Sequence, residues 1–188
     1  SGADAALALA CYTAGSHEAF VAQMNEKELN RALRTGLPSG VFLLYGSDRY
    51  LVERYASLIV DRAVKGDKTF NYERVDGAKI DFDHLYDSIL TLPMMAERRA
   101  VMLDDPDIDK LSAGDLDKLL QILNDAVEPT VFIIAIKQNE FLPKKSSRCR
   151  KLLEAVDRLG IAAELGERSA ADLAAFVMKR CAAAGCTI

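Results

Sequence analysis

A strand-like run that leads into a glycine loop and a helix is the first place in this sequence where chemistry could occur. The apolar residues 41–45 precede Gly46, Ser47 and Asp48, and helical periodicity follows them. A loop of this kind can bind phosphate, but it then needs a second glycine and a lysine for the β- and γ-phosphates. This loop lacks both, and Asp48 would repel phosphate. We therefore expect a degenerate nucleotide loop at Gly46, Ser47 and Asp48, with no cofactor.

Two consecutive carboxylates, Asp104 and Asp105, follow the strand-like run at residues 99–103. Their position resembles the acidic strand end that holds magnesium in P-loop ATPases. The phosphate loop is degenerate, however, and Pro106 follows at once. We therefore expect solvated carboxylates that end a strand and no metal site.

Other catalytic or metal-binding patterns are weak. His84 lies close to three aspartates in an amphipathic helical pattern, which is more typical of a surface histidine than of a general base. The cysteines include no C-x-x-C pair and lie far from both histidines; they are Cys11, Cys149, Cys181 and Cys186. We expect neither a zinc site nor disulfides. No serine or cysteine has a recognisable nucleophile context.

Basic residues gather in residues 144–151, beginning at Lys144 and ending at Lys151. This run could contact nucleic acid or an acidic protein. It contains no aromatic residue for base stacking, and the chain as a whole carries a formal net charge of −4. We therefore interpret the run as a solvated helix face, with nucleic-acid binding as the alternative.

The segment Thr91-Leu92-Pro93-Met94-Met95-Ala96-Glu97-Arg98-Arg99 carries the most information. Pro93 ends or kinks the preceding helix, which leaves two consecutive methionines on a short turn before a strand. Adjacent residues cannot lie on one helical stripe, so one or both should face solvent. Flexible thioether side chains suit insertion into a partner's apolar pocket. The alternative is that Met94 and Met95 fill the edge of the domain's own core.

Strand-like and helix-like patterns alternate through most of the chain. The chain has 188 residues, of which 50% are hydrophobic and 28% charged, as in a globular protein with a full core. Strands separated by helices need crossover connections, which favour a parallel sheet covered on both faces. We expect a three-layer α/β fold with a five-stranded, mainly parallel sheet. Its strands fall at residues 41–45, 70–75, 99–103, 130–136 and 161–165.

The expected domain organisation has three parts. We expect residues 1–23 to be a tag or upstream extension, with Met24 as the natural start. We expect residues 24–165 to form the α/β domain and residues 166–188 to begin a second, helical domain whose remainder is missing. No segment has the apolar length needed to span a bilayer, so we expect no membrane partner.

Three stretches together resemble the DNA polymerase III delta subunit family. Residues 42–51 (Phe-Leu-Leu-Tyr-Gly-Ser-Asp-Arg-Tyr-Leu) are similar to its first strand and loop, and residues 70–77 to its second strand. Residues 90–101 resemble its most recognisable stretch, a Leu-Pro followed by an apolar pair, a small residue and arginines. The resemblance implies an AAA+-like (P-loop-NTPase-like) domain without ATP binding, followed by a small helical lid.

The resemblance also implies a function, which is to bind the sliding clamp and help open the ring for loading onto primed DNA. The implied clamp-binding residues are Leu92, Pro93, Met94, Met95 and Arg98. Many relatives place Leu-Phe or another bulky pair where this chain has two methionines.

Further implied partners are other clamp-loader subunits, through a missing C-terminal domain, and DNA indirectly through the complex. The subunit would be non-catalytic and cytoplasmic. Two alternatives stay open, an active AAA+-type nucleotide hydrolase, which tight ATP binding would indicate, and a nucleic-acid-binding module.

Overall fold

The computed structural model describes residues 23–37, 40–126, 128–166, 174 and 178. Within these residues, five strands form one sheet in the order β2-β3-β4-β1-β5, and every neighbouring pair is parallel. The strands are β1 (Val41–Tyr45), β2 (Tyr72–Asp76), β3 (Arg99–Asp104), β4 (Thr130–Ala135) and β5 (Ile161–Glu164).

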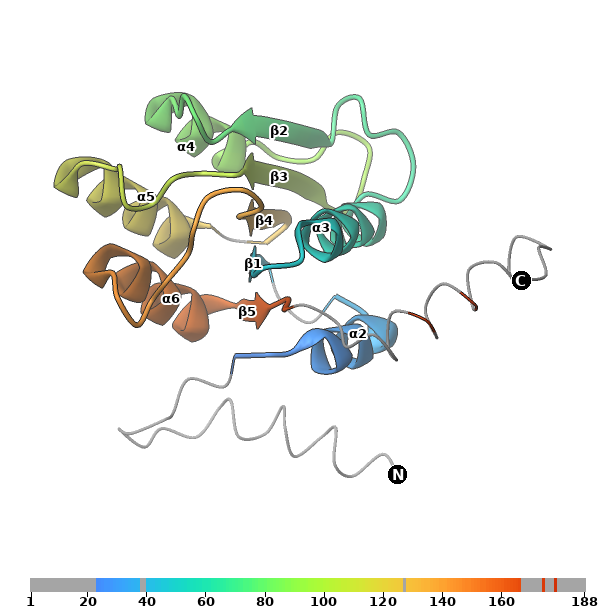
Figure 1. Ribbon diagram of the computed structural model, residues 1–188. Helices are drawn as coiled ribbons and strands as arrows, with labels where there is room; N and C mark the ends of the chain where they lie inside the picture. Colours follow the sequence, from blue (N-terminus) through green and yellow to red (C-terminus); the bar gives the residue numbers. More distant parts are fainter. Residues whose placement is uncertain (1–22, 38–39, 127, 167–173, 175–177, 179–188) are drawn as a thin grey trace.

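Helices cover both faces of the sheet, as Figure 1 shows. They are α2 (Glu26–Thr35), α3 (Arg49–Ala63), α4 (Phe82–Leu90), α5 (Ala113–Asp125) and α6 (Ser147–Leu159). One face packs against α4, α5 and α6, and the other against α2 and α3. The predicted three-layer α/β fold with a parallel sheet is confirmed.

The central strands supply both hydrophobic cores because successive side chains of a strand point to opposite faces. In β1, Leu43 belongs to the core under α4, α5 and α6, whereas Phe42 and Leu44 belong to the core under α2 and α3. All residues of β1 and β4 are buried. This two-sided burial explains why the sequence of these strands is an unbroken apolar run.

Strand β2 begins two residues later than the sequence predicted. Phe70 and Asn71 were expected in the strand, but the chain turns there, and the N–H groups of Asn71 and Tyr72 both donate to the Lys68 carbonyl, at 3.3 and 2.9 Å. β2 is an edge strand and only Val75 in it is buried, so its apolar pattern is weak. The turn places Phe70 and Asn71 at the edge of the sheet where β2 and β3 begin.

Helix α2 is an element that the sequence analysis did not assign. Asn25 and Glu28 form a capping box at its start, and Leu29 and Leu33 are buried under it. Just before α2, Met24 pairs with β5, because its N–H donates to the Ala162 carbonyl at 3.0 Å. This pairing extends the sheet at its β5 edge.

The expected extension at residues 1–23 lies outside the described residues apart from Gln23, and so does the expected lid apart from Gly166, Ala174 and Met178. Both stay predictions. Of the four cysteines only Cys149 is described, as a buried free thiol. In the described part of the chain, no helix is both long and apolar enough to cross a bilayer.

Candidate partner-binding site

Gly46 ends β1 at the carboxyl edge of the sheet, where open α/β sheets usually bind ligands. Its φ of 140° favours glycine, and a Cβ there would lie 2.2 Å from the carbonyl oxygen of Leu165. The Leu165 N–H donates to the Tyr45 carbonyl at 2.7 Å, and the Leu165 carbonyl accepts from the Asp48 N–H at 3.1 Å. The glycine therefore permits close packing against the chain that follows β5.

The remaining residues of this loop serve the fold. Oδ1 of Asp48 accepts from the Leu51 N–H at 3.0 Å and caps α3, while Ser47 is exposed. This arrangement gives the predicted degenerate loop a structural role. Its inability to bind nucleotide stays a prediction.

An ion-pair network joins the carboxyl ends of β2, β3 and β4. Nζ of Lys137 lies 2.6 Å from Asp104 Oδ1 and 2.8 Å from Glu53 Oε2, and its side chain is only 8% exposed. Nε of Arg74 donates to Asp104 at 2.9 Å. Burial lowers the pKa of Lys137, but hydrogen bonds to Asp104 and Glu53 outweigh burial and raise it. The charges at this edge thus compensate one another.

Asp105 is bonded to the backbone that follows β4. Its Oδ1 accepts from the N–H groups of Lys137 at 2.7 Å, Gln138 at 2.8 Å and Asn139 at 3.3 Å. Burial raises the pKa of Asp105, but these N–H donors and the Lys137 charge prevail and lower it. The expectation that Asp104 and Asp105 are solvated is therefore wrong, because residues 137–139 fold over the end of β3. The described residues contain no group of three or more His, Cys, Asp or Glu side chains that could hold a metal ion.

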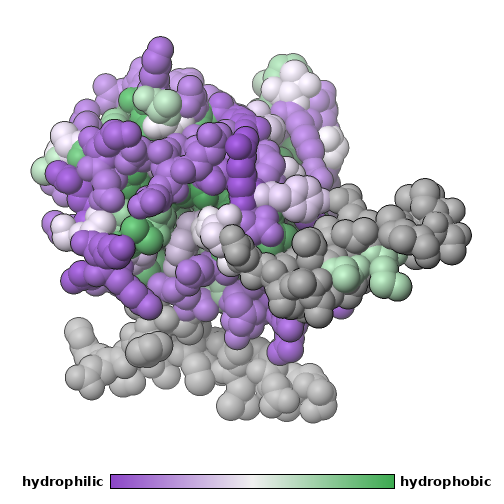
Figure 2. Space-filling view, in the orientation of Figure 1, coloured by the Kyte–Doolittle hydropathy of each residue, from purple (hydrophilic) through white to green (hydrophobic). Residues whose placement is uncertain are grey.

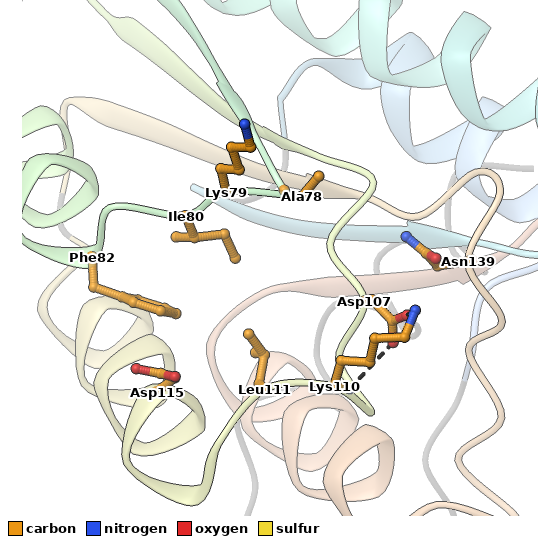
Figure 3. Close-up of a pocket in the computed structure, with 10 residues that line it drawn as sticks. Ala78, Lys79, Ile80, Phe82, Asp107, Lys110, Leu111, Asp115 and Asn139 are labelled. Carbon is orange, nitrogen blue, oxygen red and sulfur yellow. Dashed lines mark hydrogen bonds and ion pairs between the residues drawn. The ribbon is translucent and has the colours of Figure 1, made fainter.

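A pocket of about 470 Å³ lies beside this edge, next to the starts of α4 and α5. Figure 3 shows Ile80, Phe82 and Leu111 lining it, together with Lys110, which pairs with Asp107 at 2.7 Å. Its lining combines apolar side chains with paired charges and lacks the glycine-rich backbone of a phosphate site. The residues that line this pocket therefore do not indicate a particular ligand.

The basic run at residues 144–151 is exposed on and before α6, apart from Ser146, which is partly buried, and Cys149, which is buried. Arg148 donates to the Asp109 carbonyl at 3.1 Å and Arg150 to the Pro143 carbonyl at 3.3 Å. Two of its charged side chains thus form hydrogen bonds to nearby loop carbonyls. The exposure of the basic residues agrees with the interpretation as a solvated helix face.

The segment between α4 and β3 lies at the opposite, amino edge of the sheet. There Leu92 is 73% exposed, Met94 is 56% exposed and Met95 is fully exposed. Pro93 is partly buried between them. We call residues 92–95 the methionine tip. The alternative that Met94 and Met95 fill the domain's own core is wrong, because both side chains project into solvent.

The buried side chain of Asn71 holds this tip by its backbone. Asn71 is 4% exposed; its Oδ1 accepts from the Met94 N–H at 2.7 Å and its Nδ2 donates to the Met94 carbonyl at 2.9 Å. Met95 follows with a φ of 53°, a conformation that bulky side chains rarely adopt. The tip is thus an ordered projection of the edge.

Two arginines lie between the tip and β3. Arg98 pairs with the exposed Glu128 at 3.1 Å. Arg99 is buried and donates to Glu73 at 2.6 Å and to the Phe70 carbonyl at 3.4 Å. Glu73 also pairs with the exposed His84 at 2.6 Å, which agrees with a surface role for this histidine.

Sequence reasoning missed two residues of this region, Phe70 and Asn71. Phe70 is 58% exposed and precedes the asparagine that binds Met94, so it adds an apolar side chain near the tip. Figure 2 shows a mainly hydrophilic face with small separate hydrophobic areas, one of them on the projection that Figure 1 shows as the loop between α3 and β2. The sequence analysis placed Phe70 inside a strand, so it did not predict that this side chain is exposed.

The family model described as "DNA polymerase III, delta subunit" matches residues 42–158. No curated protein sequence matches the chain significantly.

Among solved structures, the clamp-loader delta protein YqeN of Bacillus subtilis is similar, with a TM-score of 0.66 and 22% identity over 81% of this chain. This chain covers 46% of that protein, which is less than half its length. A gamma subunit-related protein of Thermotoga maritima is less similar, with a TM-score of 0.49 and 16% identity over 80% of this chain and 49% of that protein.

Proposed function

Because the chain belongs to the DNA polymerase III delta subunit family, we propose that it acts as a clamp-loader delta subunit. In this proposal the methionine tip binds the sliding clamp, and the subunit helps to open the ring for loading onto primed DNA. In the same proposal the subunit assembles with the other clamp-loader subunits, and DNA is reached through the assembled complex. The subunit acts in the cytoplasm.

The observation that carries this proposal is the exposure of two adjacent methionines on a loop whose backbone is fixed. Exposed apolar side chains that project from an ordered edge favour insertion into an apolar pocket of a partner. Burying both side chains would contribute about 3–5 kcal/mol before the cost of association. Leu92 and Phe70 would add contact area beside them, and Arg98 would lie at the rim.

Ring opening would follow from a difference in binding. A ligand shifts an equilibrium only by as much as its affinities for the two states differ. We propose that the tip binds an open clamp interface more tightly than a closed one, so that the free energy of binding supports the opened ring. No hydrolysis by this chain is needed for that step.

A non-catalytic role is supported by the carboxyl edge of the sheet. The space beside Gly46 is taken by the backbone of Leu165, and Lys137 already pairs with Glu53 and Asp104. An active nucleotide hydrolase would need a lysine and a carboxylate available for phosphate and magnesium at this edge. No observation favours the nucleic-acid-binding alternative.

The test is a titration of the purified sliding clamp from the same organism with the full chain and with a Met94→Ser, Met95→Ser double variant. We expect affinity to fall at least about a hundredfold, because the apolar contribution of both side chains is removed. Thermal unfolding should be unchanged, since neither side chain is buried.

A matched control is Leu142→Ser, which changes a partly exposed apolar side chain in the segment after β4, at the opposite edge of the sheet. It should bind the clamp as the unchanged chain does. Equal affinity of the double variant and the unchanged chain would reject the proposal.

A further inference from the structure

The side chain of Asn71 lies buried at the point where the methionine tip meets the sheet. We propose that Asn71 is a positioning residue, which holds the tip in the conformation that binds the partner. This inference rests on the proposed function, since it concerns the same surface. Asn71 itself is too buried to contact a partner, so it would act through Met94 and Met95.

The hydrogen bonds of Asn71 hold Met94 by both of its backbone polar groups. Asn71 accepts from the N–H of Met94 and donates to its carbonyl, at 2.7 and 2.9 Å. These two bonds restrain the peptide groups before and after the Met94 Cα. The next residue, Met95, has a φ of 53°, which a methionine seldom adopts without restraint. The asparagine thus supplies the bonds that a neighbouring strand would otherwise supply.

Asn71 can act as an anchor because its own backbone is fixed. Its carbonyl accepts from the Ala100 N–H at 2.8 Å, and its N–H donates to the Lys68 carbonyl at 3.3 Å. The preceding carbonyl, of Phe70, accepts from Arg99. The tip is therefore tied to the β2 and β3 pair, and its direction follows from the sheet.

A restrained tip binds more tightly because less conformational entropy is lost on association. Without Asn71 the segment would sample other conformations, and the Met94 N–H and carbonyl would exchange their bonds for water. We expect Asn71→Ala, which loses both hydrogen bonds to Met94, to bind the clamp about tenfold more weakly.

The experiment measures clamp affinity together with amide hydrogen exchange at Met94. In Asn71→Ala the Met94 amide should exchange rapidly, whereas in Asn71→Asp it should stay protected, because a carboxylate still accepts from it. Asn71→Asp lacks the donor to the Met94 carbonyl at neutral pH, so its affinity should be intermediate. If Asn71→Ala does not fold, Asn71→Ser takes its place in the measurements of Met94 exchange and clamp affinity.

The matched control is Asn25→Ala, which removes an asparagine whose side chain caps α2. It should lower stability and leave both Met94 exchange and clamp affinity unchanged. A purely structural role for Asn71 would lower stability in the same way without weakening binding by the folded protein.

The outcomes separate this inference from the proposed function. Slow exchange of the Met94 amide in Asn71→Ala would overturn the inference, whatever the affinity of this variant for the clamp. Weak binding by the methionine double variant with full affinity in Asn71→Ala would overturn it too. Full affinity in the double variant would reject the proposed function, and the exchange measurement would still decide whether Asn71 restrains the tip.

Discussion

Met95 combines two properties that the stability of this fold does not require. Its side chain is fully exposed, and its φ of 53° is in the left-handed region, which glycine and asparagine adopt at lower cost. A methionine at this position adds strain and buries nothing. Such a residue is expected where the side chain serves a partner.

We therefore predict that Met95→Asn separates the effect on stability from the effect on clamp binding. Asparagine accepts the left-handed conformation, so the free energy of unfolding should be unchanged or rise by up to about 1 kcal/mol. Clamp affinity should fall at least about tenfold, because the apolar side chain is lost. Urea unfolding and calorimetric titration measure the two effects.

The opposite pattern would show that Met95 supports its own domain. That pattern is a loss of more than about 1 kcal/mol in unfolding free energy with unchanged affinity. Leu142→Asn, at another exposed apolar residue, controls for a general effect of a polar substitution.

The end of β3 and the segment after β4 are joined by one carboxylate. Asp105 accepts from three consecutive N–H groups, of residues 137–139, and its carbonyl accepts from the Asn139 side chain at 2.7 Å. The pKa of Asp105 is lowered from 3.8 although burial opposes the shift. A lowered pKa means that the folded state favours the carboxylate. This contribution is fully present above pH 3.8 and is lost as the pH falls through the lowered value.

We predict different effects for two substitutions of Asp105. Asp105→Ala leaves three N–H groups without their acceptor and should cost about 1–3 kcal/mol at neutral pH. Asp105→Asn keeps an oxygen acceptor and tolerates the φ of 56°, so its cost should be smaller, and it should lack the acid-dependent part of the stability. Urea unfolding between neutral pH and about pH 3 measures both. An Asp105→Ala variant as stable as the unchanged chain would contradict this account of the edge.

The sequence predicted elements well where the residues themselves carry the pattern. β1 and β4 are apolar runs that are buried on both faces. α2 was missed although Asn25 and Glu28 carry its capping box, because it lies before the repeating pattern of strands and helices.

The supporting residues of the site could not be predicted in this way. Asn71 bonds to a backbone 23 residues away, and Lys137 bonds to Glu53, which is 84 residues away. The local periodicity of a sequence cannot predict such distant pairs, because they depend on which strands become neighbours in the sheet. Phe70 was misplaced because an edge strand has a weak apolar pattern.

At the scale of the whole molecule, the two edges of the sheet have different properties. At the carboxyl edge, where α/β proteins usually bind small ligands, the backbone of Leu165 fills the space beside Gly46, and Lys137 forms an ion pair with Asp104. The amino edge of β2 and β3 carries the exposed methionine tip. The two most exposed large apolar side chains of the described residues, Leu92 and Met95, thus lie at the end of the strands opposite to the usual ligand-binding edge.

The most direct test of the proposed contact is NMR of the methionine methyl groups while the purified sliding clamp is added. The chain has five methionines, Met24, Met94, Met95, Met102 and Met178, and single substitutions assign their signals. We predict that the Met94 and Met95 signals shift or broaden strongly, while the buried Met102 and the partly buried Met24 stay in place. Clamp binding that leaves the Met94 and Met95 signals unchanged would contradict the account.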